Sequence, residues 1–150
     1  MGVEMSFLKS MMEKEPPEPT NPIGTVVIGN LEPDLMDTPK EMVRKSLKRA
    51  QFKTIDLGRS VPATTFAAKA KEVNADVIAI SVNLTSAKEN LQKLLVAIEN
   101  EGLMGKVTVM IGGAAVTKED ADKICALYGK NKDEAVVFAK KAIEGKSASK

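Results

Sequence analysis

Short apolar runs alternate along this chain with longer segments in which apolar residues recur every three or four positions. The runs cover residues 25–29, 52–57, 76–81, 106–111 and a short stretch near 124–128. The longer segments predict helices at about 38–50 and 63–73, from Ser86 up to Gly102, from Thr117 onward, and at about 133–143. This alternation predicts an α/β fold, a doubly wound sheet of five parallel strands in the order 2-1-3-4-5 with helices on both faces.

Three helix starts carry capping signals. Thr38 with Glu41 forms the pattern of a capping box, and Pro39 suits the first helical position. Ser86 with Glu89 repeats the capping pattern, and Thr117 with Asp120 is a weaker version of it. Residues 30–37 are therefore predicted to form a loop over the carboxyl end of the first strand.

That strand order brings the loops of residues 30–37, 81–86 and 112–117 to one crevice. The first loop is acidic and polar, the second carries three hydroxyl groups, and the third begins with a glycine pair that would let a bulky ligand approach the backbone. We expect a deep slot beside the fourth strand, suited to an elongated ligand.

The two ends of the chain differ in composition from its middle. Residues 1–22 comprise a Met-rich segment followed by a Pro-rich stretch that predicts an extended linker. Residues 23–145 form the predicted domain, and the Lys/Ser tail at 146–150 is expected to be disordered.

Composition narrows the chemistry of the predicted domain. The net charge is +2 and the aromatic residues are four Phe and one Tyr, so nucleic acid and membrane partners are not expected. The chain has no histidine, which excludes a Ser-His-Asp triad and a histidine metal site. The single cysteine, Cys125, follows Ile124 in an apolar run and predicts a buried structural thiol in a reducing, cytoplasmic setting.

Four stretches add a more specific signal. Residues 32–40, 57–62, 81–85 and 112–117 read EPDLMDTPK, LGRSVP, SVNLT and GGAAVT. They resemble, in order and spacing, the motifs E-G-D-x-H-D-x-G-K, L-G-x-D-V-P, S-x-L-x-T and G-G-x-x-V-T of the cobalamin-binding domains of corrinoid proteins and methionine-synthase-type methyltransferases. The resemblance runs from about Gly24 to the last helix and implies a Rossmann-like, flavodoxin-like domain.

The resemblance also implies a site. In this family the nucleotide tail of the cofactor enters the slot and the corrin ring lies across the strand ends. The implied cofactor-binding residues are Asp34, Leu35, Met36, Asp37, Ser81, Leu84, Thr85, Gly112, Gly113, Ala114 and Thr117. Met36 takes the position of the family's cobalt-ligating histidine, and Pro39 that of a glycine. A thioether would ligate cobalt weakly or only shield the lower face of the ring.

Three interpretations follow. The first is a base-off, His-off corrinoid (cobalamin) protein that carries a methyl group between donor and acceptor methyltransferases and is not itself an enzyme. The second is a degenerate domain that has lost the cofactor and acts as an interaction or regulatory module. The third is another flavodoxin-like module, binding a flavin or serving as a receiver. A homo-oligomer stays open in each. The carrier interpretation requires that the three loops meet around an open groove.

Overall fold

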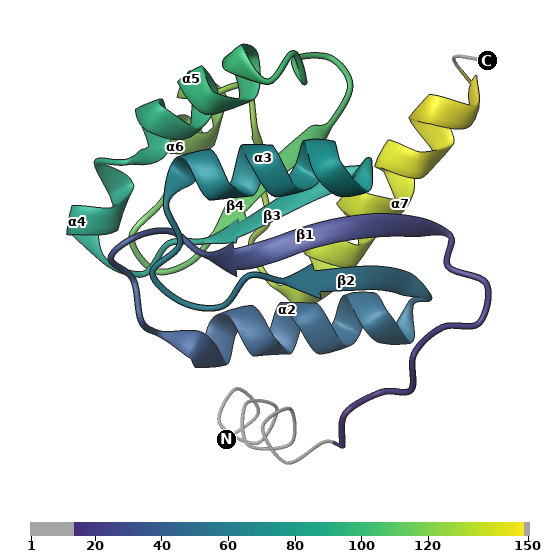
Figure 1. The fold of residues 1–150 in the computed structure, drawn as a ribbon. Coiled ribbons are helices and arrows are strands. Elements are labelled where there is room, and N and C mark those ends of the chain that lie inside the picture. The colour runs from purple at the N-terminus through teal and green to yellow at the C-terminus, as the bar shows by residue number, and fades with distance from the viewer. Residues whose placement is uncertain (1–13, 149–150) are drawn as a thin grey trace.

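The computed structural model describes residues 14–148. Its helices and strands alternate as the sequence pattern predicts (Figure 1). In chain order they are β1 (Gly24–Asn30), α2 (Asp37–Arg49), β2 (Phe52–Asp56), α3 (Ala63–Val73), β3 (Val77–Ser81), α4 (Thr85–Lys88), α5 (Leu91–Asn100), β4 (Thr108–Gly112), α6 (Lys118–Lys123), β5 (Leu127–Tyr128) and α7 (Lys132–Ala148). The predicted strands and helices are thus present, with ends displaced by a few residues.

All five strands are parallel and lie in the order β2-β1-β3-β4-β5, which confirms the predicted topology. The register aligns the carboxyl ends of the central strands, since Asn30 of β1 lies opposite Ser81 of β3, and Ser81 lies opposite Gly112 of β4. The loops that follow these three strands therefore leave the sheet at the same edge.

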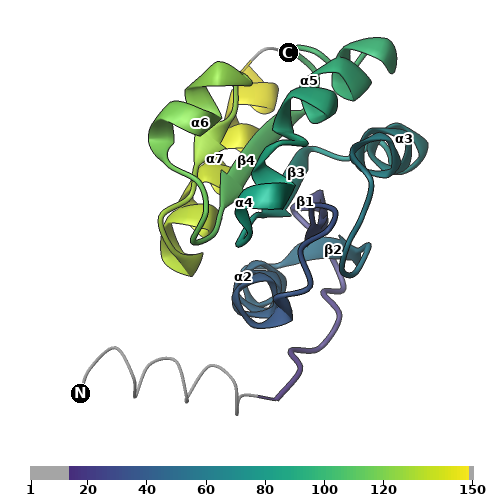
Figure 2. The ribbon, with the colours of Figure 1, turned by 90° about the vertical axis from the view of Figure 1, so that its left-hand side faces the viewer.

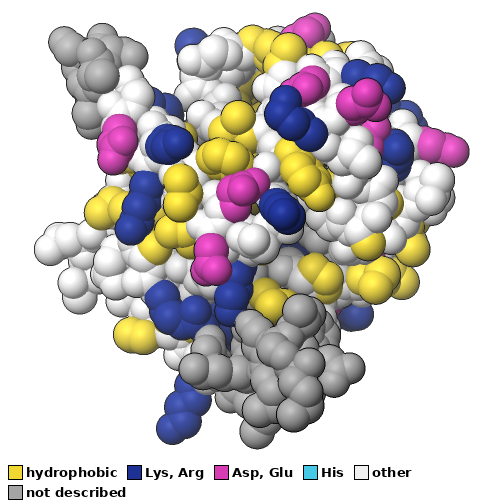
Figure 3. All heavy atoms as spheres, turned by 180° about the vertical axis from the view of Figure 1, so that it is seen from behind, with side chains coloured by type: hydrophobic (Ala, Val, Ile, Leu, Met, Phe, Trp, Pro, Cys, Tyr) yellow, Lys and Arg dark blue, Asp and Glu magenta, His cyan; other side chains and the backbone are white. Residues whose placement is uncertain are grey.

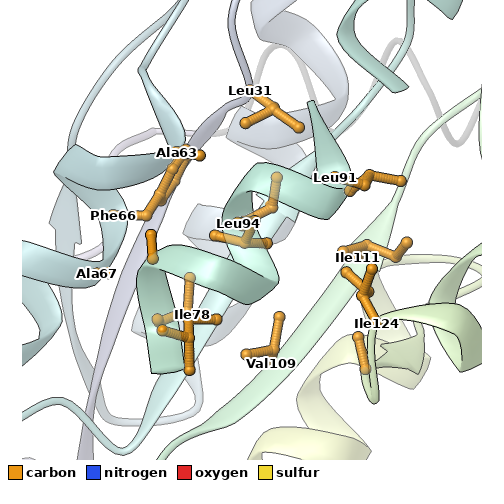
Figure 4. Packing of buried hydrophobic residues seen from close by; sticks show 14 of the residues in the cluster. Leu31, Ala63, Phe66, Ala67, Ile78, Leu91, Leu94, Val109, Ile111 and Ile124 are labelled. Carbon is orange, nitrogen blue, oxygen red and sulfur yellow. The ribbon is translucent and has the colours of Figure 1, made fainter. Parts of the chain in front are cut away.

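The sheet has a separate apolar core on each face, because side chains of successive strand residues point to opposite sides. On one side Ile78 lies in a cluster with Phe66 of α3 and Leu94 of α5 (Figure 4), whereas on the other side Val26 and Val77 pack with α2 and α7. Both faces are covered, which explains why β3 is buried along its whole length.

Two of the three predicted capping boxes are wrong. Helix α2 begins at Asp37, with Met36 at its N-cap and no side-chain cap, so Thr38 lies inside the helix. The helix predicted from Ser86 is two helices, and Ser86 lies within the first of them, α4. The break lets Asn90 donate from Nδ2 to the carbonyl oxygen of Glu32 at 2.7 Å, a contact between distant segments that no local pattern reveals.

The third capping box is present at α6. The Thr117 Oγ1 accepts a hydrogen bond from the backbone N–H of Asp120, and the Asp120 carboxylate accepts one from the backbone N–H of Thr117 at 2.9 Å. Lys88 of α4 pairs with the same carboxylate at 3.1 Å, so Asp120 also joins two helices.

Residues 14–22 contain no helix or strand, as expected of a linker, but they are held against α2. Glu15 pairs with Arg44 at 2.6 Å and with Lys48 at 2.7 Å, and Pro16 is buried. The hydrogen bonds from Arg44, and secondarily from Lys48, lower the pKa of Glu15 to about 2. The predicted Met-rich segment of residues 1–13 lies outside the described residues.

Two further expectations differ from the structure. Helix α7 continues to Ala148, past the start of the expected disordered tail, and Lys146 pairs with Asp76 at 2.7 Å. Cys125 is exposed and not buried. It has a positive φ of 58° just after α6, and this turn points its side chain outward while Ile124 and Ala126 on either side are buried.

Among residues 14–148 no helix is long and apolar enough to cross a bilayer. On the face shown in Figure 3, acidic and basic side chains are interspersed, with apolar side chains between them. This face thus carries no extended region of a single charge.

The Asp120 contacts predict a pH-dependent contribution to stability. Burial, the largest influence, raises the pKa of Asp120, but the hydrogen bonds from Lys88 and Thr117 together outweigh it and lower the pKa below its usual 3.8. Asp120→Asn should lower the free energy of unfolding at pH 7 by about 1–2 kcal/mol, measured by urea denaturation. The difference should shrink below about pH 4, as the wild-type carboxylate takes up a proton.

The matched control is Asp122→Asn, because Asp122 lies in the same helix and makes only an exposed pair with Lys118 at 3.2 Å. Its effect should stay within about 0.5 kcal/mol. Equal losses for the two variants would show that the contacts of Asp120 contribute nothing particular.

Candidate functional site

The carboxyl ends of the strands form one edge of the molecule, which Figure 2 views from the front. In this view α4 lies between α2 and α6. Each of these helices is entered from one of the three loops that the sequence places at a common crevice. The loops do meet there, as the carrier interpretation requires.

A buried carboxylate joins the first two loops. Asp34 is fully buried in the loop after β1, and its Oδ2 accepts hydrogen bonds from the backbone N–H of Asn83 at 2.8 Å and from the Asn83 Nδ2 at 2.9 Å. Its Oδ1 accepts a hydrogen bond from the backbone N–H of Met36 at 2.9 Å. Asn30 at the end of β1 donates to the same carboxylate and to the carbonyl oxygen of Met36. The carboxylate is thus supplied with donors by both loops, as a buried charge requires.

Asn83 extends this network to the third loop. Its Nδ2 donates to the Ser81 Oγ at 3.0 Å, and its Oδ1 accepts a hydrogen bond from the backbone N–H of Ala114 at 3.1 Å. The loops after β1, β3 and β4 are therefore connected by hydrogen bonds through two side chains, Asp34 and Asn83.

A cavity of about 960 Å³ opens beside this network, between α2 and α7. Its floor is the side of β1, β3 and β4 that packs against these helices, and small residues such as Ala79 and Ala135 leave the space open. The lining residues are Ile28, Pro39, Lys40, Met42, Val43, Ala79, Ile80, Ser81, Asn83, Met110, Ile111, Gly112, Gly113, Ala114, Tyr128, Gly129, Lys130, Asn131, Lys132, Asp133 and Ala135. The cavity is apolar at its floor and polar where it reaches the loops, and no side chain among residues 14–148 fills it.

Nearby backbone explains why two glycines stand at the end of β4. Gly113 has a φ of +118°, and a Cβ there would collide with the carbonyl group of Val82. A Cβ on Gly112 would lie 2.7 Å from the carbonyl oxygen of Gly129. Both glycines line the cavity, but neighbouring backbone, and not the room needed by a ligand, makes glycine necessary at these positions.

The predicted site residues divide into two groups. Ser81, Gly112, Gly113 and Ala114 line the cavity. The others lie around its loops without lining it. They are the buried Asp34, the exposed Leu35, Met36 and Leu84, the helix-initial Asp37 and Thr85, and Thr117, whose hydroxyl caps α6.

Three residues of this second group are large, apolar and exposed to solvent. Leu35 is 60% exposed, Met36 is 50% exposed and Leu84 is 37% exposed, and all three follow the carboxyl ends of β1 or β3. Large apolar side chains left in water at a loop edge are typical of a surface that another group covers. Among the described residues no cluster of three His, Cys, Asp or Glu side chains could hold a metal ion.

The first turn of α2 carries Lys40, whose side chain is almost completely buried. Its Nζ lies 2.9 Å from Asp37 and 2.9 Å from Asp56 at the end of β2. Burial, the largest influence, lowers the pKa of Lys40, but the hydrogen bonds to Asp37 and Asp56 reverse this and leave the pKa raised. Lys40 is thus charged at neutral pH and holds this cavity wall against the sheet.

Sequence reasoning missed two parts of the site. It did not include residues 128–133, which run from the end of β5 into the start of α7, although the strand order places this segment at the same edge and could have identified it. It also passed over Asn83, the central residue of S-V-N-L-T, although an asparagine in place of the leucine of S-x-L-x-T is a departure from the motif that could have drawn attention to it.

Comparisons with known proteins agree with this geometry. The model of the B12 binding domain matches residues 24–137. Trimethylamine corrinoid protein 1 of Methanosarcina mazei is 38% identical over 144 residues, which cover 95% of this chain and 66% of that protein. The protein of the same name from Methanosarcina acetivorans is 42% identical over 137 residues, which cover 91% of this chain and 63% of that protein.

A solved structure gives the same result. The crystal structure of a cobalamin-binding protein from Desulfitobacterium hafniense DCB-2 superposes with a TM-score of 0.75 at 28% identity, over 79% of this chain and 58% of that one. The chain spans less than two thirds of the length of each of these three proteins. The match of residues 24–137 includes all three loops and most of the cavity. On these grounds the chain belongs to the B12-binding domain family.

Proposed function

We propose that this chain binds a corrinoid and carries a methyl group between methyltransferases. The observation that carries the proposal is the open cavity of about 960 Å³ at the edge where the three loops meet. Its volume lies in the upper part of the range of small-molecule sites, roughly 300–1,000 Å³. When bound, the corrinoid supplies the cobalt centre to which the methyl group is attached.

The cavity fits the nucleotide tail of a corrinoid by its chemistry as well as its size. Ala79, Met110 and Ala135 offer apolar contacts to a flat heterocyclic base at the floor. Ser81 and Asn83 offer hydrogen-bonding groups nearer the loops, and Lys130 adds a positive charge that suits a phosphodiester. Gly112, Gly113 and Ala114 contribute a backbone surface that a ligand can approach closely.

The rim of the cavity supports binding without a histidine. Leu35, Met36 and Leu84 are exposed apolar side chains on the loops beside the cavity, and we propose that the lower face of a corrin ring lies against them. Met36 is the residue we assign to the cobalt side, where its thioether is a soft, neutral and weak ligand. A corrinoid bound in this way would be base-off and His-off, because its nucleotide tail would be held in the protein cavity and the chain offers no histidine.

The partners in this proposal are methyltransferase proteins that donate and accept the methyl group. The relatives that support it are both named trimethylamine corrinoid protein 1, and the chain covers only part of each. In this role the chain is a cytoplasmic carrier subunit and holds its cofactor, while the chemistry at the substrates belongs to the partners.

One observation favours a second function, a cofactor-free interaction module. The carboxylate of Asp34 is already supplied with donors by the loops themselves, so the first two loops hold together without a ligand. Such a domain would keep its exposed apolar rim for a protein partner. Cofactor binding distinguishes the two functions directly.

Blocking the cavity mouth tests the carrier proposal. Ala114 is exposed and lines the cavity, so Ala114→Trp should weaken binding of hydroxocobalamin by about tenfold or more through steric exclusion of the tail. Ala68→Trp, on an exposed position of α3 away from the cavity, is the control and should bind like the wild type. Spectrophotometric titration and retention of colour through gel filtration measure both. Colourless wild-type protein after gel filtration would reject the carrier function in favour of the interaction module.

A substitution at the metal side tests the position of Met36. Met36→His should move the visible spectrum of bound hydroxocobalamin away from that of the wild type, because imidazole is a stronger cobalt ligand than a thioether. Met36→Leu should bind the cofactor with the wild-type spectrum or a small shift. A histidine variant that binds without any spectral change would show that residue 36 does not lie under the ring.

A further inference from the structure

We infer that Asn83 is a positioning residue that couples occupation of the cavity to the loop carrying Met36. The inference rests on the proposed function, since it concerns how a ligand in the cavity affects the metal-side loop. It assigns a role to Asn83, which stands in place of the leucine of S-x-L-x-T.

The geometry places Asn83 between the two halves of the site. Asn83 lines the cavity, whereas Met36 does not and lies half-exposed at the N-cap of α2. The Asn83 Nδ2 lies 2.9 Å from Asp34 Oδ2, and the other oxygen of the same carboxylate accepts the backbone N–H of Met36. The side-chain path from the cavity to Met36 therefore consists of two hydrogen bonds through one carboxylate, to which the backbone N–H of Asn83 also donates.

The other side of Asn83 faces the third loop. Its Oδ1 accepts the backbone N–H of Ala114, and Ala114 also lines the cavity. A tail packed against Asn83 and Ala114 restricts the rotation of the Asn83 amide, and this restriction holds Asp34 in place. The loop of Met36 is then more strongly ordered when the cavity is filled than when it is empty.

Amide exchange in the free protein tests the connection itself. Asn83→Ala should raise the exchange rate of the Met36 amide by about tenfold relative to core amides of β3, which serve as the reference for global stability. Asn90→Ala is the matched control, because the Asn90 Nδ2 also bonds the first loop, at Glu32, yet Asn90 does not line the cavity. It should leave the exchange of the Met36 amide close to the wild-type rate.

Asn83→Asp separates the two sides of the network. A carboxylate at position 83 still accepts the Ala114 amide, but it repels the neighbouring Asp34. We expect fast exchange at Met36 and slow exchange at Ala114 in this variant. Fast exchange at both amides would indicate general loosening and would contradict a directed connection.

Two corrinoids test the coupling. Hydroxocobalamin carries the nucleotide tail, and cobinamide has the same ring without it. In the wild type and in Asn90→Ala, hydroxocobalamin should slow Met36 exchange at least about threefold more than cobinamide does. In Asn83→Ala the two corrinoids should have the same effect on Met36, even where both still bind.

The results distinguish this inference from the proposed function. If hydroxocobalamin binds and Asn83→Ala keeps the wild-type difference between the two corrinoids, the inference is overturned and the carrier function stands. If neither corrinoid binds the wild type, the carrier function and the coupling both fail. Equal Met36 exchange in free wild type and free Asn83→Ala would overturn the inference without any cofactor.

Discussion

The site depends on one constraint, a negative charge buried at the end of β1. A buried carboxylate must be surrounded by donors, and Asp34 finds them in the loop that contains it and in the loop after β3. These hydrogen bonds fix the position of Met36, which precedes α2, and the position of Asn83. Because Asn83 also holds the Ala114 amide, the requirement of a single carboxylate determines the relative positions of three loops.

The fold could be predicted because its evidence is periodic and redundant. Each strand is a short apolar run and each helix an amphipathic stretch, so the architecture survives an error at any one boundary. The predicted helix starts at Thr38 and Ser86 are wrong. Near these positions Asp34 holds the Met36 amide and Asn90 separates α4 from α5, and both residues also bond distant partners, Asn83 and Glu32, which no local pattern reveals. The capping box at Thr117 was predicted correctly, and there the partners lie three residues apart.

The site shows the same difference between features set by a regular pattern and features set by contacts between distant residues. Strand order alone places the loops at one edge, and residues such as Ser81 and Gly112 could be identified from that order and the resemblance together. The width of the cavity could not be predicted, because it depends on the spacing of α2 and α7 across a floor with small side chains at Ala79 and Ala135. The burial of Cys125 was also mispredicted, because one residue with positive φ reverses the direction of a side chain within an apolar run.

Helix α2 explains how the cavity can persist without a histidine ligand. The helix starts beside Met36 and supplies one cavity wall. Lys40 holds its first turn to Asp56 at the end of β2, and Glu15 holds its later turns through Arg44 and Lys48. These ion pairs hold the helix that forms the cavity wall, and Met36 takes no part in them. In the proposed carrier, a substitution at position 36 would therefore change the side chain facing the cofactor, while the cavity itself is maintained by contacts elsewhere on the same helix.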